Sequence, residues 1–174
     1  MAEKLYGVKD VIEITGLDRN RIYYWSKTLS VVKPDYMVPG RHLYKLRALL
    51  DFRLIAELLK MGIGPSRIES IVWPTRDVDV DGIGTAILPD QQFWDIFIED
   101  RWKYENEGFF FICREKRSKY ATFDEYFAAT SKQVEPIVWH EAGQMPPPLT
   151  TSAILINLLY IIHEVEEKTG EKLE

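Results

Sequence analysis

The stretch that decides the fold is VKDVIEITGLDRNRIYYWSKTL, residues 8–29. In its first half, Val8, Val11 and Ile12 lie three and four positions apart, which places them on one face of a short helix. Gly16 ends that helix and permits a sharp turn. Asp18 then suits the N-cap of a second helix, because its carboxylate can accept a hydrogen bond from a free backbone N–H. Two short helices joined by a glycine-containing turn are typical of the helix-turn-helix motif.

The second helix is expected to have a buried side and an exposed side. Ile22, Trp25 and Leu29 follow the helical spacing and are expected to face the core. The opposite side would present five side chains to solvent: Arg19, Asn20, Tyr23, Tyr24 and Lys27. Arginine and asparagine can read base edges in the DNA major groove, whereas lysine and tyrosine hydroxyls suit phosphate oxygens. An ordinary solvated helix face would carry the same pattern, so the segment that follows decides between the two interpretations.

A two-stranded hairpin is predicted directly after this helix. Val31 and Val32 are strand formers, residues 34–40 form the loop, and residues 42–44 form the return strand. Such a hairpin would act as a wing, and Arg41 and His42 would meet a flanking DNA backbone or minor groove. Its position favours a DNA-binding face over a solvated one.

Two further helices are predicted before the middle of the chain. Residues 45–61 form an amphipathic helix that ends at Gly62 and Gly64. Pro65 fits the first turn of a short helix that stops before Pro74.

In this order the stretches YGVKDVIEITGLDRNRIYYWSK, VVKPDYMVPGRHLY and LIAELLKMGIGPSRIESI resemble the N-terminal DNA-binding domain of MerR-type transcription regulators, over roughly residues 5–72. Three features carry the resemblance: the turn Thr15–Asp18 with the aromatic run after it, the wing between Lys33 and Tyr44, and the stretch Leu58–Ile63. The resemblance implies a winged helix-turn-helix fold. It also implies a homodimer that binds a near-palindromic promoter site in double-stranded DNA and deforms it for RNA polymerase.

By this resemblance, Tyr24 takes the place of the family's phosphate-contacting tyrosine. Tyr23 and His42 stand where the family usually has arginines, and Arg41 beside His42 can substitute for one of them. Losing two fixed cations should lower DNA affinity and weaken its salt dependence. The predicted DNA-binding set is Arg19, Asn20, Tyr23, Tyr24, Lys27, Arg41, His42 and Tyr44.

Charge and composition agree with this class of protein. Residues 1–73 carry 12 Lys and Arg against 8 Asp and Glu, whereas residues 74–174 carry 10 against 19, so the front is basic and the back acidic. The single cysteine, Cys113, excludes an internal disulfide. The longest apolar stretch, residues 153–162, has 10 residues and is broken by Asn157, whereas a bilayer span needs about 20. The start of the chain has no run of signal-peptide type. A cytoplasmic protein without a membrane partner is therefore expected.

The back half is expected to be a small mixed domain. Residues 93–98, 109–113 and 134–139 read as strands, residues 122–129 as a short helix, and residues 143–148 as a stiff proline-rich linker. The acidic loop 76–85 marks the domain boundary. The predicted fold is thus mainly α with an α+β C-terminal part, divided into residues 1–75 (winged helix-turn-helix), 76–148 (mixed α+β, regulatory) and 149–174 (C-terminal amphipathic helix).

The C-terminal helix is predicted over residues 150–168, with a cap among residues 150–152 and its end at Gly170. Its apolar residues repeat at the spacing 4, 3, 4 of a coiled-coil seam. This seam is the predicted dimerisation set: Ile154, Leu158, Ile161 and Val165. Packing against the protein's own domain is the alternative interpretation.

The sequence gives little support for a metal or small-molecule binding site. Asp77, Asp79 and Asp81 match the first half of a calcium loop, but Leu88 stands where a bidentate glutamate is needed, so a polar interdomain loop is favoured. Surface histidines are expected at 140 and 163, and a buried thiol at Cys113. The aromatic residues between 93 and 139 either fill a core or line a pocket for a small-molecule effector.

No catalytic set with recognisable spacing is present, so neither an enzyme nor a metal or other cofactor is expected. Two alternatives to a sensing regulator stay open. One is a DNA-binding module whose back half is a protein-interaction platform without small-molecule sensing. The other is a small enzyme in the region 90–148.

Overall fold

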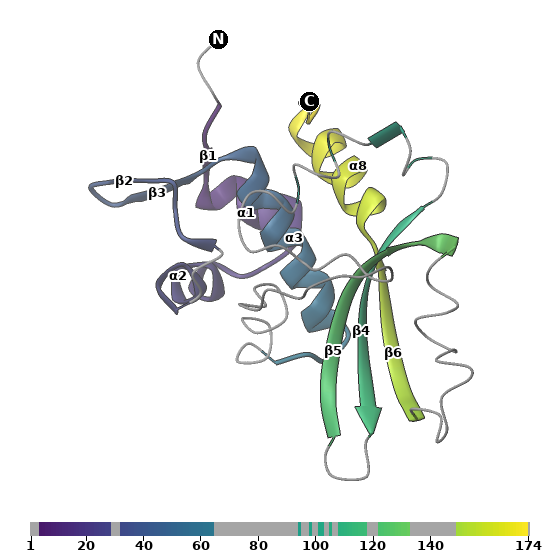
Figure 1. The fold of residues 1–174 in the computed structure, drawn as a ribbon. Helices are drawn as coiled ribbons and strands as arrows, with labels where there is room; N and C mark the ends of the chain where they lie inside the picture. The colour runs from purple at the N-terminus through teal and green to yellow at the C-terminus, as the bar shows by residue number, and fades with distance from the viewer. Residues whose placement is uncertain are drawn as a thin grey trace.

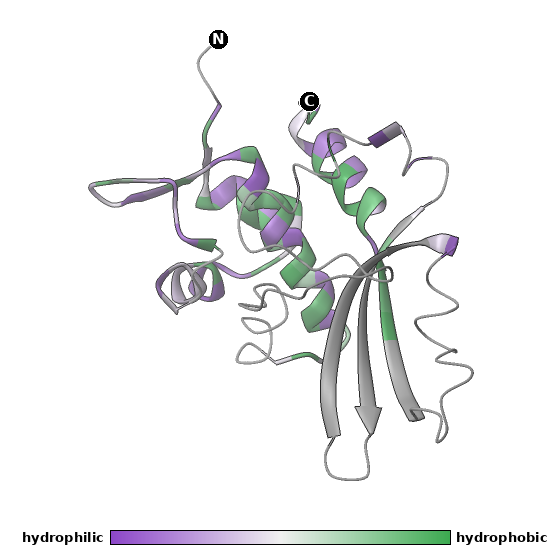
Figure 2. Cartoon of the chain, viewed as in Figure 1, coloured by the Kyte–Doolittle hydropathy of each residue, from purple (hydrophilic) through white to green (hydrophobic). Residues whose placement is uncertain are grey.

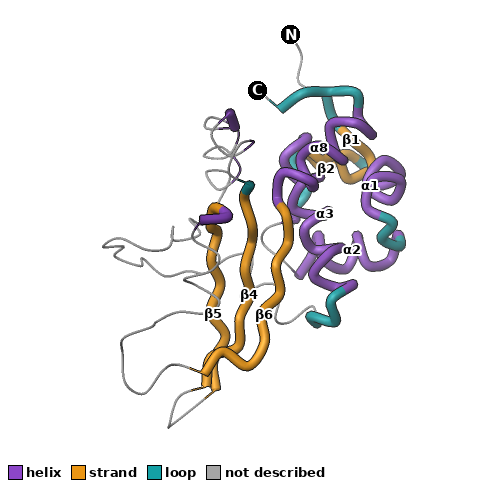
Figure 3. The backbone as a smooth tube through the Cα atoms, turned by 90° about the vertical axis from the view of Figure 1, so that its right-hand side faces the viewer, coloured by secondary structure: helices purple, strands orange, loops and turns teal. Residues whose placement is uncertain are grey.

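The computed structural model describes residues 4–28, 32–64, 108–117, 122–132 and 149–173, together with residues 94, 98, 101, 102 and 105. A helical N-terminal part lies beside a three-stranded antiparallel sheet, and the C-terminal helix returns to the N-terminal part (Figure 1). Viewed from the side, the helices gather on one side of that sheet (Figure 3).

The predicted helix-turn-helix is confirmed as a pair of helices. Helix α1 spans Val8–Thr15 and helix α2 spans Arg19–Thr28. Gly16 has a φ of 70°, a conformation that glycine adopts without steric cost, and its N–H donates to the carbonyl of Ile12. Asp18 caps α2 as expected, because its Oδ1 accepts a hydrogen bond from the N–H of Arg21 at 2.9 Å.

The predicted hairpin is present, but its strands have different bounds. Strand β2 spans Tyr36–Val38 and pairs with β3, Arg41–Tyr44, so that Val38 lies opposite Arg41. The predicted loop over residues 34–40 is wrong, because Pro39 and Gly40 alone make the turn. Proline sets its own φ and Gly40 supplies a positive φ of 73°, the combination that a type II turn needs. Val32, predicted in a strand, is instead a buried residue outside any strand.

A two-residue strand that was not predicted completes this first sheet. Strand β1, Tyr6–Gly7, pairs antiparallel with β3, which gives the order β1-β3-β2. The start of α1 is thereby attached to the hairpin.

Two amphipathic helices form the centre of the molecule. Helix α3 spans Leu46–Lys60, as predicted, and packs against α1 and against helix α8, Leu158–Thr169. In Figure 2 both helices are coloured partly as hydrophobic and partly as hydrophilic, as expected for amphipathic helices. Their apolar faces join one core with those of α1 and α2. Buried in this core are Val11, Ile14, Ile22, Trp25, Leu49, Leu50, Phe52, Ile55, Leu158, Ile161 and Val165.

The second sheet has the order β5-β4-β6. Strand β4 spans Phe109–Arg117, which confirms and lengthens the predicted strand over 109–113. Strand β5 spans Thr122–Thr130, so the predicted helix over 122–129 is wrong. The aromatic residues of that segment favour a strand, and they pair in register with β4, Tyr126 opposite Cys113. The predicted strand over 93–98 is also wrong where it is described, because Trp94 and Ile98 are helical.

The C-terminal segment changes from strand to helix at Asn157. Strand β6 spans Leu149–Asn157, and α8 begins only at Leu158, so the helix predicted from residue 150 is too long. Threonine and β-branched residues favour the strand, and the ladder with β4 satisfies its backbone. The Asn157 side-chain oxygen then caps α8 by accepting from the N–H groups of Leu159 and Tyr160, at 3.1 and 3.3 Å.

Several predicted features lie outside the described residues. They are Leu29, Val31, the helix after Pro65, the loop 76–85 with its three aspartates, the strand 134–139, His140 and the linker 143–148. The side chain of Cys113 lies outside them as well. Within the part of the chain that is described, no helix is both long enough and apolar enough to cross a membrane.

Candidate nucleic-acid interface

Helix α2 presents four of its predicted contact residues to solvent: Arg19, Asn20, Tyr24 and Lys27. The opposite face holds the helix in the core through Ile22 and Trp25, which are 0% and 2% exposed. Tyr24 is 60% exposed. The helix can therefore be approached by a large ligand along its outer side without disturbing the core.

Tyr23 is half-buried and links α2 to the hairpin. The Arg19 guanidinium lies over its ring, 5.8 Å from the centroid. The His42 ring meets it edge to face, with centroids 4.9 Å apart and planes at 66°. Through Tyr23, these two contacts link Arg19 on α2 to His42 on β3.

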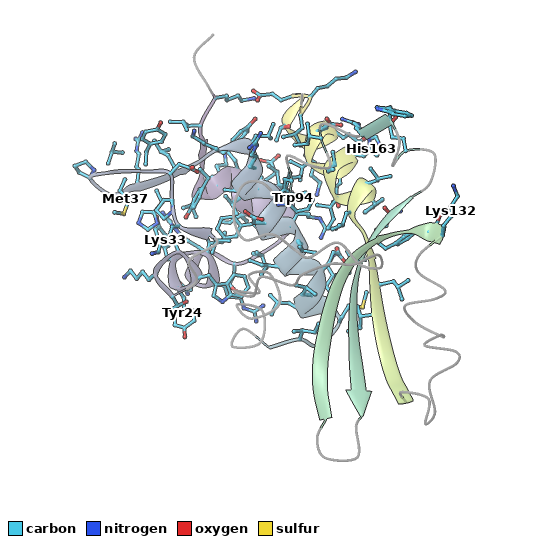
Figure 4. All side chains as sticks on the ribbon, viewed as in Figure 1. Tyr24, Lys33, Met37, Trp94, Lys132 and His163 are labelled. Carbon is cyan, nitrogen blue, oxygen red and sulfur yellow. The ribbon has the colours of Figure 1, made fainter. Side chains whose placement is uncertain are left out.

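The hairpin brings Arg41 to the surface beside these residues, whereas His42 is only half exposed. The Nδ1 atom of His42 is buried and has no hydrogen-bond partner among the described residues. The strand before the turn is exposed along its whole length, and Met37 is 74% exposed. Figure 4 shows Tyr24, Lys33 and Met37 on the same side of the N-terminal part.

Tyr44 does not belong to the exposed surface. It is fully buried, and its ring meets Phe52 of α3 edge to face at 5.2 Å. The Ser26 hydroxyl donates to the carbonyl of Ile22, so the Tyr44 hydroxyl must donate to Ser26 Oγ, 2.7 Å away. Burial raises the pKa of Tyr44, although its hydrogen bond to Ser26 opposes the rise. Tyr44, predicted to contact DNA, is therefore a core residue that links β3 to α2 and α3.

Lys33 is a candidate that the sequence reasoning missed. It is exposed and lies between α2 and the hairpin in the chain, which was the available signal. With Arg19, Lys27 and Arg41 it gives four exposed cations on α2, the hairpin and the segment between them; a fifth, Arg21 of α2, is paired with Asp18. Two nearby acids have partners other than these four cations. Asp18 pairs with Arg21 at 3.0 Å, and Asp35 Oδ2 accepts a hydrogen bond from the N–H of Lys45 at 2.8 Å.

The pair α1–α2, with its three-residue turn, its capped second helix and the hairpin behind it, is the arrangement of a helix-turn-helix region with a β-hairpin. Residues 6–72 match the family model described as MerR HTH family regulatory protein. Residues 6–72 are therefore similar to a MerR-type domain, and this region is called the MerR-type domain. The match supports DNA binding and transcription regulation as the work of this domain. Among curated protein sequences, none matches the chain.

An ion-pair network centred on a buried arginine of α3 connects the MerR-type domain to α8. Arg53, only 5% exposed, pairs with Glu57 on its own helix and with Glu164 of α8 at 2.7 Å. Burial alone would raise the pKa of Glu164, but hydrogen bonds from Lys168 and Arg53 outweigh it and hold that pKa below its usual range. The network therefore stays ionised and joins α8 to the MerR-type domain.

A second contact on α3 involves Asp51, whose pKa is shifted upwards, in contrast to that of Glu164. Trp94 Nε1 donates to Asp51 Oδ1 at 2.7 Å. Burial raises the pKa of Asp51 to about 7, and the hydrogen bond from Trp94 only partly offsets it.

The residues predicted for dimerisation lie elsewhere than expected. Ile154 is half-buried on strand β6, and Leu158, Ile161 and Val165 are fully buried on α8 in the common core. This core includes residues of α1 and α3, so α8 packs within its own chain. His163 is exposed, as predicted. The described residues contain no group of histidine, cysteine, aspartate and glutamate suited to a metal ion.

Proposed function

We propose that the protein is a transcription regulator that binds promoter DNA through α2 and the β2–β3 hairpin. The observation that carries the proposal is a set of exposed cations on α2, the hairpin and the segment between them, Arg19, Lys27, Lys33 and Arg41, within the region that matches the MerR family model. DNA binding needs such a surface, because neutralising phosphates supplies much of the affinity.

Each side chain has a distinct role in this proposal. Arg19 and Asn20, at the N-terminal end of α2, read base edges in the major groove. Tyr24, Lys27 and Lys33 contact phosphates and set the register of the helix on the duplex. Arg41 contacts the flanking backbone or minor groove. Tyr23 and His42 support Arg19 through their ring contacts.

The proposal includes a homodimer on a near-palindromic site, because two copies are needed to grip half-sites about one helical turn apart. The apolar face of α8 is occupied within the chain, so the two copies would meet through another surface. RNA polymerase is the expected partner at the promoter. A small-molecule effector would act through the back half, and a thermal shift with the right compound would reveal it.

The proposal is tested by fluorescence anisotropy with a duplex selected from a random library by the wild-type protein. Arg19→Ala should weaken specific binding by roughly 10- to 100-fold, as for a lost base contact of about 1–3 kcal/mol. Lys27→Ala should weaken all duplexes alike and reduce the salt slope by about 1. Lys172→Ala, a matched change at an exposed C-terminal lysine, is the control. Equal affinity of Arg19→Ala and Lys172→Ala for the selected duplex would refute the recognition role of α2.

A further inference from the structure

The C-terminal helix α8 is part of the DNA-binding unit, although about a hundred residues separate the two in sequence. Its buried residues Leu158, Ile161 and Val165 share one core with Val11 and Ile14 of α1. A charged contact at its centre, Arg53 with Glu164, adds to this packing.

The end of α8 reaches the turn of the helix-turn-helix directly. Lys168 Nζ donates to the backbone carbonyl of Ile14 at 2.7 Å and to Glu164 Oε1 at 2.8 Å. The last four carbonyls of a helix have no partner within the helix, and Ile14 is the residue before the last in α1. A cation there also interacts favourably with the negative end of the helix dipole. Lys168 therefore provides a hydrogen-bond donor for the free Ile14 carbonyl at the end of α1, where the chain turns towards α2.

This turn is short, so a movement of the end of α1 is passed on to α2. It spans Gly16–Asp18, and Leu17 within it is buried, with its N–H donating to Thr15 Oγ1 at 3.2 Å. Asp18 at its end is already the cap of α2. No flexible segment separates Lys168's contact from the helix that carries Arg19.

At its other end, α8 continues the sheet. Asn157 is both the last residue of β6 and the N-cap of α8, so no linker separates them. At the C-terminal end of α8, a further contact joins the helix to the N-terminus of the chain. There Lys4 Nζ approaches Glu171 Oε1 at 3.2 Å and donates to the carbonyl of Thr169 at 3.3 Å. Helix α8 is thus a rigid connection from the second sheet to the helix-turn-helix turn.

We propose that Lys168 is a positioning residue for DNA binding: through the carbonyl of Ile14 it holds the α1–α2 turn, and α8 passes the position of the second sheet to the recognition helix. This inference rests on the proposed function for its effect on DNA. The contact itself is tested separately from DNA.

The first arm of the test measures hydrogen exchange in the full chain. Lys168→Met keeps the aliphatic stem but removes the donor, Lys168→Arg restores a donor, and Lys172→Met removes the same charge four residues away. Amide exchange at Gly16 and Leu17 should be roughly tenfold faster in Lys168→Met, as expected when a part-exposed charged hydrogen bond is lost. Lys168→Arg should return it close to the wild-type rate, and Lys172→Met should leave it unchanged.

The second arm measures anisotropy with the library-selected duplex at a temperature where every variant is folded. Lys168→Met should bind roughly tenfold more weakly than Lys172→Met, with recovery in Lys168→Arg. Exchange equal to that of Lys172→Met overturns the inference, and so does faster exchange with unchanged DNA affinity, since the role would then be structural only. If wild-type protein binds no duplex while exchange responds as expected, the proposed function fails but the tether between α8 and the turn stands.

Discussion

Asp51 should make the protein less stable as the pH rises towards 8. Its carboxylate, on α3, accepts a hydrogen bond from Trp94 Nε1 at 2.7 Å, and burial raises its pKa from the usual 3.8 to about 7. The folded state therefore binds this proton more tightly than the unfolded chain does. Between these two pKa values the unfolded state holds fewer protons, so the free energy of unfolding falls as the pH increases.

The size of the effect follows from the same two pKa values. Each pH unit between them corresponds to about 1.4 kcal/mol, which gives about 4 kcal/mol over the whole window and about 3 kcal/mol between pH 5 and 8. A domain of this kind is stable by about 5–15 kcal/mol, so the change is large enough to measure. The acids Glu57, Glu164 and Glu166 have lowered pKa values, and their contribution is lost only as the pH falls below about 4.5.

Urea unfolding at pH 5, 6, 7 and 8 measures this dependence. Asp51→Asn keeps an oxygen that can accept from Trp94 and removes the ionisable group, so its unfolding free energy should vary about 3 kcal/mol less than that of wild type over this range. Glu13→Gln, a change at an exposed acid on α1, should follow the wild-type curve. The same pH dependence in Asp51→Asn and wild type would refute the reasoning.

Three further substitutions test the support of the interface. Tyr44→Phe should lower the unfolding free energy by about 1 kcal/mol through loss of its hydrogen bond and leave DNA affinity unchanged; weaker DNA binding by the folded variant would restore Tyr44 as a contact residue. Gly16→Ala should cost about 1–2 kcal/mol in urea unfolding, because its φ is 70°; an unchanged midpoint would contradict that turn. Arg53→Met should cost about 2 kcal/mol by removing the charged hydrogen bonds of Arg53 to Glu57 and Glu164, which then keep, among the described residues, only Lys60 and Lys168 as partners, and adding Glu164→Gln should recover part of this loss.

The N-terminal elements could be predicted because their signals are local. Gly16, Asp18 and the spacing of Ile22 and Trp25 each act within one helical turn. In the structure α1 ends before Gly16, α2 begins after Asp18, and α3 lies within one residue of the expected range 45–61. Burial of Tyr44 could not be read in this way. It depends on the Ser26 hydroxyl, 18 positions earlier in the chain, which provides a buried partner for the phenol.

The back half depends on contacts that are distant in sequence. The segment 149–169 has apolar residues at spacings that suit a helix, so periodicity alone did not separate β6 from α8. What makes residues 149–157 a strand is the ladder with β4, about 40 residues earlier. The same holds for β5, whose alternative as a short helix was locally reasonable. The packing of α8 on α3 likewise required Arg53 and Glu164 to meet across 111 positions.

The most direct test of the account is a map of the DNA contact on the protein. Backbone NMR spectra of the 20.3 kDa chain with the library-selected duplex report which amides change on binding. We predict that the largest changes fall on residues 19–27 and 33–42, with smaller ones at Gly16 and Leu17. Changes concentrated on the second sheet or on the exposed side of α8, with α2 unaffected, would contradict the account.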